Sequence, residues 1–286
     1  MRAAIRMTVS LLKLRIGVAV AASAMAGIAA AHGPIPHAWQ PLGLALAVLG
    51  ASGAAGAFNH YYERDLDQRM HRTRARPFAT GAFGDSRWWP VGFLGLLLAS
   101  LVLALVVAGP VATFFVLLGA FTYGIVYTVW LKRRTPLNIV VGGLAGSFAV
   151  LAGAALVDPT PQPLPVVLAL VLFLWTPPHF WSLAVAGAKD YARAGVPMLP
   201  VVAPTHVWKA VILAHTVVLV AVSLVPLMLG SGLMYGVGAV GGGGLFLSMS
   251  IALYRDPTPK AAIRNFLASL AQLGLLVAGV VLDALM

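Results

Sequence analysis

The chain has 286 residues, of which 60% are hydrophobic and only 9% are charged, and its mean hydropathy is +0.92. A soluble domain carries about 25% charged residues, so this composition excludes a water-soluble globular protein. The formal net charge is +11, but the basic residues lie in short stretches between apolar runs, which is typical of the cytoplasmic side of a membrane protein and does not indicate nucleic-acid binding. The absence of cysteine excludes disulfides and thiolate chemistry.

Nine apolar runs of about 20 residues predict nine membrane-spanning helices. The runs cover residues 16–32, 40–59, 89–108, 110–130, 137–157, 164–186, 207–229, 232–254 and 263–283. The runs are continuous, whereas the strands of a membrane barrel alternate between apolar and polar residues. We therefore expect an all-α polytopic membrane protein that forms one domain over residues 1–286.

The basic residues predict the orientation of these helices. All 19 Lys and Arg fall in the amino-terminal segment, which carries Arg2, Arg6, Lys13 and Arg15, or in every second connection after it. Cytoplasmic loops of membrane proteins carry the excess of Lys and Arg. This distribution predicts a cytoplasmic amino terminus and a carboxyl terminus on the outer side.

The second predicted span ends in a group of acidic and basic residues, NHYYERDLDQRMHRTRARP (59–77). Asn59, Glu63 and Asp67 are spaced four apart, so a helix places them on one face. Such oxygen ligands suit Mg²⁺, which binds through one or two carboxylates together with substrate phosphates. Arg72 and Arg76 can pair with phosphate oxygens. The stretch predicts a Mg²⁺–diphosphate site at the membrane surface; the alternative is a solvated loop with internal salt bridges.

Two more polar stretches lie on the same predicted side. AKDYARAGVPMLP (188–200) follows the sixth predicted span and contains Asp190, in a connection that Gly and Pro hold in a non-helical shape. Lys132 and Arg133 follow the fourth predicted span, where they can reach an anionic head group. The alternatives are an ordinary loop for the first stretch and a positive-inside anchor for the second.

LWTPPHFW (174–181) lies inside the sixth predicted span. Pro177 and Pro178 predict an interruption of the helix here, because proline lacks the N–H that a helix needs. His179 lies at this interruption beside Trp175. The aromatic faces can attract a carbocation, and the alternative is a packed, hydrogen-bonded histidine in an aromatic core.

These stretches carry a resemblance to a known family. The pattern Asn-x-x-x-acid-x-x-x-Asp at residues 59–67 resembles the first signature of the UbiA superfamily of intramembrane prenyltransferases. YERDLDQRMHRTRARP, YTVWLKRRTPLNIVVGGLAG, WTPPHFWSLA and DYARAGVPMLPVV resemble its heme O synthase (protoheme IX farnesyltransferase) family, and this likeness covers nearly the whole chain. The first signature by itself indicates only the superfamily.

The resemblance implies nine helices around a central cavity, capped by two acidic cytoplasmic loops, in a bacterial or archaeal cytoplasmic membrane. The implied reaction joins the farnesyl group of farnesyl diphosphate to a vinyl group of heme B, adds water and releases diphosphate, with Mg²⁺ as the cofactor. The implied metal and catalytic residues are Asn59, Glu63, Asp67 and Asp190, the diphosphate contacts are Arg72, Arg76, Lys132 and Arg133, and the heme-pocket candidates are His179, Trp175 and Tyr191. Membrane lipid is an implied partner, as is a heme A synthase or terminal oxidase assembly that receives the product.

The chain departs from the family pattern in its second loop. Gly187 stands three residues before Asp190, where relatives commonly have a basic residue, and Asp190 has no second acid beside it. The number of metal ions therefore stays open.

Three other functions fit parts of this sequence, and each makes a different demand on it. A UbiA-type enzyme that prenylates an aromatic acid shares the first signature, but should lack WTPPHFW and AGVPMLP. A transporter of anionic substrates should carry charge at mid-membrane. A heme-binding assembly factor would not need the acids and arginines of both loops.

Overall fold

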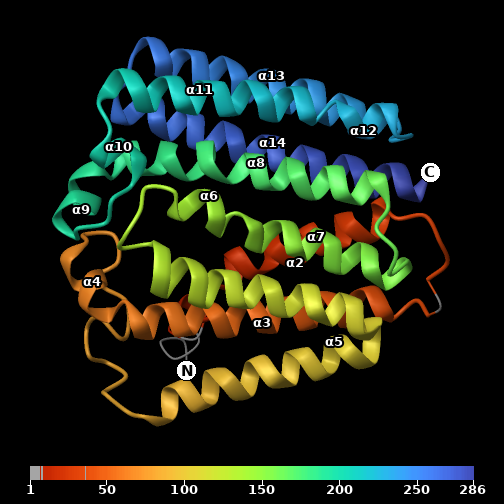
Figure 1. Ribbon diagram of the computed structural model, residues 1–286, viewed down its shortest axis with the longest axis horizontal. Helices are drawn as coiled ribbons and strands as arrows, with labels where there is room; N and C mark the ends of the chain where they lie inside the picture. The colour runs from red at the N-terminus through yellow and green to blue at the C-terminus, as the bar shows by residue number, and fades with distance from the viewer. Residues whose placement is uncertain (1–6, 8, 36) are drawn as a thin grey trace.

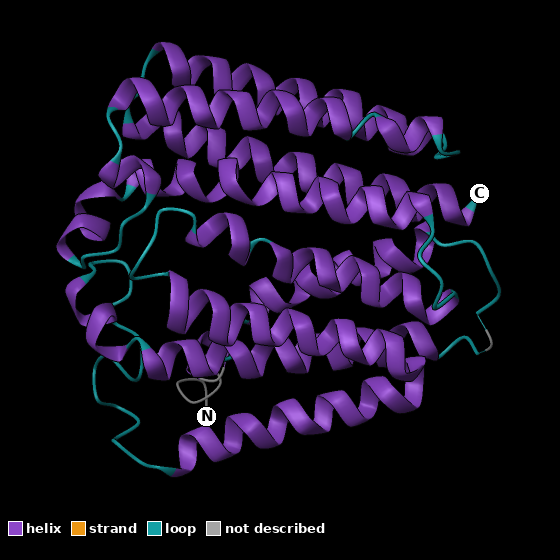
Figure 2. Ribbon diagram, in the orientation of Figure 1, coloured by secondary structure: helices purple, strands orange, loops and turns teal. Residues whose placement is uncertain are grey.

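The computed structural model describes residues 7, 9–35 and 37–286, so Arg2 and Arg6 of the predicted cytoplasmic terminus lie outside the described residues. Every regular element within these ranges is a helix (Figures 1 and 2). The elements are α2 (Leu14–Ala30), α3 (Gln40–Tyr62), α4 (Arg64–Arg69), α5 (Trp88–Phe121), the π-helix η1 (Thr122–Leu131), α6 (Asn138–Gly142), α7 (Leu144–Val157), α8 (Pro163–Ala186), α9 (Ala188–Arg193), α10 (Leu199–Val202), α11 (Thr205–Val222), α12 (Val225–Met228), α13 (Leu233–Arg255) and α14 (Pro259–Leu285).

Within the described ranges, seven segments are long and apolar enough to cross a membrane. They are Gln40–Tyr62, Trp88–Leu131, Asn138–Val157, Pro163–Ala186, Thr205–Met228, Leu233–Arg255 and Pro259–Leu285. The predicted all-α membrane protein is confirmed, but the predicted count of nine spans differs from these seven in two places. The first span, α2, is a shorter apolar helix of 17 residues, and the third and fourth spans form one run of 44 residues. Nine spans therefore stays a prediction.

The 44-residue run does not cross a membrane as one straight helix. At 1.5 Å per residue it would be about 66 Å long, roughly twice the hydrocarbon thickness of a bilayer. Gly109 has φ 78° and ψ −178° inside it, a conformation essentially restricted to glycine, and Pro110 follows. Figure 1 shows the chain turning back within α5, so that the parts before and after the turn run in opposite directions.

The backbones of α2 and α7 approach each other closely where they cross. A Cβ atom at Gly27 would overlap the carbonyl of Val150, and one at Gly153 would overlap the carbonyl of Ala24. Small residues allow this kind of contact between membrane helices, which then gain dispersion energy along their whole length. The two glycines therefore set the distance between the helices.

We expect Gly153→Val to force α2 and α7 apart and to lower the free energy of unfolding by about 1–3 kcal/mol or more, as overpacking of a core does. Thermal unfolding in detergent measures the effect. Gly95→Val on α5 is the matched control, because a Cβ at that position meets nothing within 4 Å. Equal unfolding temperatures for the two variants would contradict the close crossing.

The connections that carry the polar motifs lie at one end of the bundle. Figure 1 shows α4, α9 and α10 gathered there, near the start of α6, while the carboxyl terminus lies at the opposite end. Buried apolar side chains hold the two loops together: Leu66 and Met70 from the first pack in one cluster with Tyr191, Val196 and Met198 from the second. This cluster explains why motifs more than 100 residues apart in sequence form one cap.

Candidate functional site

The first motif lies where α3 ends and α4 begins. Asn59 belongs to α3, Glu63 joins the two helices, and Asp67 belongs to α4. The backbone N–H of Asp67 still donates to the carbonyl of Glu63 (2.8 Å), so the helical register continues across the junction. The exposed fractions of the three residues are only 2%, 0% and 1%. The alternative of a solvated loop is therefore wrong for these three residues.

Both carboxylates of the motif are bound to basic side chains. Lys132 Nζ lies 2.5 Å from Glu63 Oε2, and Arg76 Nη1 lies 2.9 Å from each carboxylate oxygen of Asp67. The second oxygen of Glu63, Oε1, is buried and has no hydrogen-bond partner among the described residues. The structure thus brings four of the predicted site residues together and leaves one carboxylate oxygen available.

Lys13 is a site residue that the sequence pattern did not reveal. Its Nζ donates to Asn59 Oδ1 (2.5 Å) and to the hydroxyl oxygen of Tyr123 (2.6 Å). Lys13 is the only described non-glycine residue with positive φ (48°), and such strain is often found at functional sites. Burial lowers the pKa of Lys13 well below its ordinary value, and the charges of Arg76 and Lys132 act in the same direction. The only signal in the sequence was a lysine directly before an apolar run.

The π-helix η1 supplies the wall of the site opposite α3. Its i→i+5 hydrogen bonding brings the hydroxyl of Thr128 to the carbonyl of Tyr123 (2.8 Å), and Thr128 in turn accepts a hydrogen bond from Asn59 Nδ2 (3.1 Å). The same geometry joins the backbone N–H of Lys132 to the carbonyl of Tyr127 (2.9 Å). π-Helical segments are rare and are frequent at functional sites. The sequence predicted only a regular span over 110–130.

Arg133 does not join this cluster. Its guanidinium donates to both oxygens of Asp65 at 3.1 and 2.8 Å, and both side chains are well exposed. These hydrogen bonds hold the pKa of Asp65 below its ordinary value. The assignment of Arg133 to the diphosphate stays a prediction.

The second motif meets the first around a cavity of about 200 Å³. The lining residues come from both loops and from the ends of α8 and α14: Met70, Arg72, Leu183, Ala186, Gly187, Asp190, Tyr191 and Ile263. Asp190 is partly exposed and pairs with Arg193 at 3.3 Å. Arg72 and Asp190, which the sequence assigned to diphosphate and metal, thus face the same cavity.

Within the described part of the chain, no three His, Cys, Asp or Glu side chains lie close enough together to hold a metal ion. Asp190 therefore does not complete a ready-made cage with Glu63 and Asp67. Mg²⁺ usually keeps several waters and shares its site with substrate phosphates, so a metal held partly by the substrate is compatible with this arrangement. The four-residue metal assignment stays a prediction.

His179 is packed between aromatic rings. Its ring stacks on Trp175 and Phe266 with centroids 4.1 and 4.5 Å away. Its Nδ1 forms a hydrogen bond with Ser269 Oγ (2.7 Å), which also lies 2.6 Å from the carbonyl oxygen of Phe266. The alternative of a packed, hydrogen-bonded histidine thus describes its resting state, and its assignment to a heme pocket stays a prediction.

The helix around His179 is not interrupted. α8 runs from Pro163 to Ala186 through Pro177 and Pro178, so the predicted interruption is wrong. Neighbouring helices and side chains support prolines in membrane helices. Tyr191, the third heme-pocket candidate, packs in the cluster of the cap.

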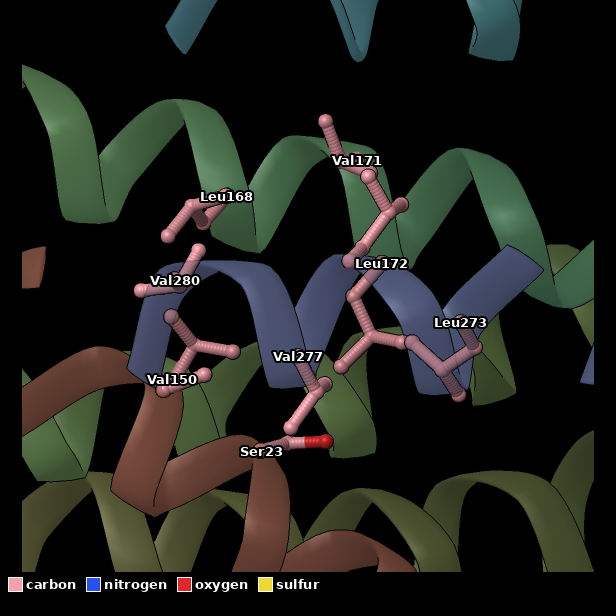
Figure 3. Close-up of a pocket in the computed structure, with 10 residues that line it drawn as sticks. Ser23, Val150, Leu168, Val171, Leu172, Leu273, Val277 and Val280 are labelled. Carbon is pink, nitrogen blue, oxygen red and sulfur yellow. The ribbon is translucent and has the colours of Figure 1, made fainter. Parts of the chain in front are cut away.

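A small void lies between the helices of the bundle. Figure 3 shows it lined by side chains of α2, α7, α8 and α14, and its volume is about 30 Å³, enough for about one or two water molecules. Its only polar lining residue is Ser23, whose hydroxyl donates to the Ala19 carbonyl of its own helix. A central cavity of substrate size stays a prediction.

Comparison with known proteins places this geometry in a family. Residues 20–274 match the UbiA prenyltransferase family. Protoheme IX farnesyltransferase 2 of Paramagnetospirillum magneticum is 55% identical over 286 residues, which cover 100% of this chain and 99% of the relative. Among solved structures, one of a digeranylgeranylglyceryl phosphate synthase has a TM-score of 0.79, with 16% identity and 98% coverage of both chains. A UbiA homolog of Archaeoglobus fulgidus bound to DMAPP and Mg²⁺ has a TM-score of 0.67 with 14% identity, over 94% of this chain and 98% of that one. The chain therefore belongs to the UbiA prenyltransferase family.

Proposed function

We propose that this protein is a heme O synthase, which transfers the farnesyl group of farnesyl diphosphate to a vinyl group of heme B. Water is added to the vinyl group, and heme O and diphosphate are the products. The 55% identical relative, named protoheme IX farnesyltransferase, supports the acceptor and the donor. The observation that carries the chemistry is the buried cluster in which Glu63 and Asp67 are each bound to a basic side chain beside Asn59.

The residues present fit a Mg²⁺ ion that is shared with diphosphate. Glu63 Oε1 is a buried oxygen without a partner among the described residues, and such an atom requires a donor or a cation. Asn59, Glu63 and Asp67 would hold the ion, with Asp190 contributing from the second loop. When bound, Mg²⁺ would neutralise developing charge on the diphosphate and so favour cleavage of the allylic C–O bond.

The basic residues bind the diphosphate by exchanging partners. Lys132 and Arg76 now neutralise Glu63 and Asp67, and a buried charge that loses its partner is costly. If the two carboxylates held a cation, Lys132 and Arg76 would be free to donate to phosphate oxygens, with which charge-assisted hydrogen bonds are strong. We therefore expect Mg²⁺ and diphosphate to bind cooperatively, and each to bind weakly alone.

The apolar interior explains why this reaction takes place in a membrane. The farnesyl chain would enter between helices lined by Leu, Val and Ala, which exclude bulk water and protect the allylic cation until the vinyl group attacks. Both organic substrates are hydrophobic and reach the protein from lipid. The cytoplasmic cap, the outer carboxyl terminus and delivery of heme O to a heme A synthase or terminal oxidase assembly are parts of the same proposal.

We expect purified protein in lipid nanodiscs, given heme B, farnesyl diphosphate and Mg²⁺, to produce a heme that has gained one farnesyl group and one hydroxyl group. Mass spectrometry of the extracted heme measures this product, and omission of Mg²⁺ is the control. If the folded protein leaves heme B unchanged and prenylates an aromatic acid, the proposed heme O synthesis would be contradicted and the rival enzyme activity supported.

A further inference from the structure

His60 is a buried side chain beside the cluster of acids and bases. It lies on α3 directly after Asn59 and one turn before Glu63, and only 2% of its surface is exposed. Neither ring nitrogen has a hydrogen-bond partner among the described residues. Buried polar groups are almost always hydrogen-bonded, so this ring requires a partner beyond the described residues, and a bound ligand can supply it.

The His60 ring faces the basic side of the site. Gly56 lies one turn earlier on α3, and a Cβ atom there would lie 3.4 Å from the Lys13 side chain. Residues four apart share a helix face, so His60 faces Lys13 as well. Asn59, directly before His60, accepts a hydrogen bond from Lys13, and Glu63, one turn after it, is paired with Lys132. A ligand that reaches His60 is therefore surrounded by cations.

The surroundings define the chemistry of this ligand. A neutral imidazole offers one N–H donor and one acceptor nitrogen. Glu63 Oε2 and both oxygens of Asp67 are already engaged by basic side chains. Glu63 Oε1 forms no hydrogen bond with any described residue, His60 included. An anion with several acceptor oxygens satisfies both the ring and the cations, and diphosphate has this character.

We propose that His60 is a further substrate-binding residue, whose ring N–H donates a hydrogen bond to a diphosphate oxygen of the prenyl donor. This inference rests on the proposed function and extends it to a residue between the fixed positions of the Asn-x-x-x-acid-x-x-x-Asp pattern. The bond would add to the charge pairs at Arg76 and Lys132 and would orient the diphosphate relative to α3.

Calorimetric binding of inorganic diphosphate to the full-length protein, in the presence of Mg²⁺, tests this assignment. We expect His60→Phe, which keeps a ring but has no donor, to weaken binding about tenfold or more, as loss of a hydrogen bond to a charged group does. His60→Gln retains an N–H donor and should bind within about threefold of the original protein. His206→Phe, at an exposed position of α11, is the matched control and should change nothing.

A second set of measurements separates binding from structure. Heme B affinity should be the same in His60→Phe as in the original protein. The ligand-free variant should be at least as stable to heat, because the substitution removes two buried ring nitrogens that have no partner among the described residues. Unchanged diphosphate affinity, or an equal loss of heme B affinity, would overturn the assignment. A nitrogen coupling from His60 in the electron paramagnetic resonance spectrum of bound Mn²⁺ would also overturn it, because the ring would then be a metal ligand. If diphosphate binding depends on His60 but the protein does not convert heme B, the role of His60 would be supported and heme B would be contradicted as the acceptor.

Discussion

Glu63→Gln is expected to reduce turnover by about 10²- to 10³-fold or more, the range seen when a group that stabilises transition-state charge is removed. The variant is nearly isosteric and keeps an oxygen that can accept from Lys132, which now lies 2.5 Å from Glu63 Oε2. Lys132 keeps a hydrogen-bond acceptor but loses its charge partner, so we expect a protein that still folds with a lower free energy of unfolding. The negative charge that attracts Mg²⁺ is lost. Heme O formation in nanodiscs measures turnover, and thermal unfolding checks the fold.

Asp190→Asn tests whether the second loop belongs to the same site. Asp190 faces the cavity that Arg72 also lines, but it is partly exposed and does not form a metal-binding group with the first motif among the described residues. We expect its loss to reduce turnover and to raise the Mg²⁺ concentration needed for half-maximal rate. If Asp190→Asn has normal kinetics while Glu63→Gln is inactive, the metal site is limited to the first loop.

Arg76→Gln is expected to destabilise the protein by about 3–5 kcal/mol, because it leaves a buried carboxylate without its charge partner. Asp67 is 1% exposed, and one Arg76 nitrogen donates to both of its oxygens at 2.9 Å. The same substitution removes a proposed diphosphate contact. Thermal unfolding in detergent measures the first effect and the KM for farnesyl diphosphate measures the second.

The double variant Asp67→Asn/Arg76→Gln separates these effects. Its two neutral amides can bond each other, so we expect most of the stability to return while activity remains absent, and the interaction energy follows from the double-mutant cycle. Arg64→Gln is the control, since the Arg64–Asp85 pair is 3.6 Å long and exposed, and such pairs contribute about 0–1 kcal/mol. Equal destabilisation by Arg64→Gln and Arg76→Gln would contradict the buried pair.

The sequence predicted the helical class and the residues of the first motif for local reasons. Hydropathy over about 20 residues is enough to predict a span, and the four-residue spacing of Asn59, Glu63 and Asp67 is enough to predict a shared face. Both follow from the chain's own helical geometry. The same local reasoning was wrong at Pro177 and Pro178, where packing by neighbouring helices keeps α8 continuous.

Only the tertiary structure could show which residues meet across the site. Lys132 is 69 residues from Glu63, and Lys13 is 46 from Asn59 and 110 from Tyr123. Each of these lysines also fits an ordinary positive-inside anchor, so the sequence could not separate a binding role from a topological one.

By itself, then, the sequence determined that this chain is a helical membrane protein with an acidic motif at the end of its second span, because hydropathy and helical spacing are properties of neighbouring residues. The tertiary structure decided that Glu63 and Asp67 are buried and paired, that a π-helix forms the opposite wall, and that His60 is buried without a hydrogen-bond partner among the described residues. These features depend on how helices distant in sequence pack together, and the energy of a buried charge depends on what that packing brings beside it.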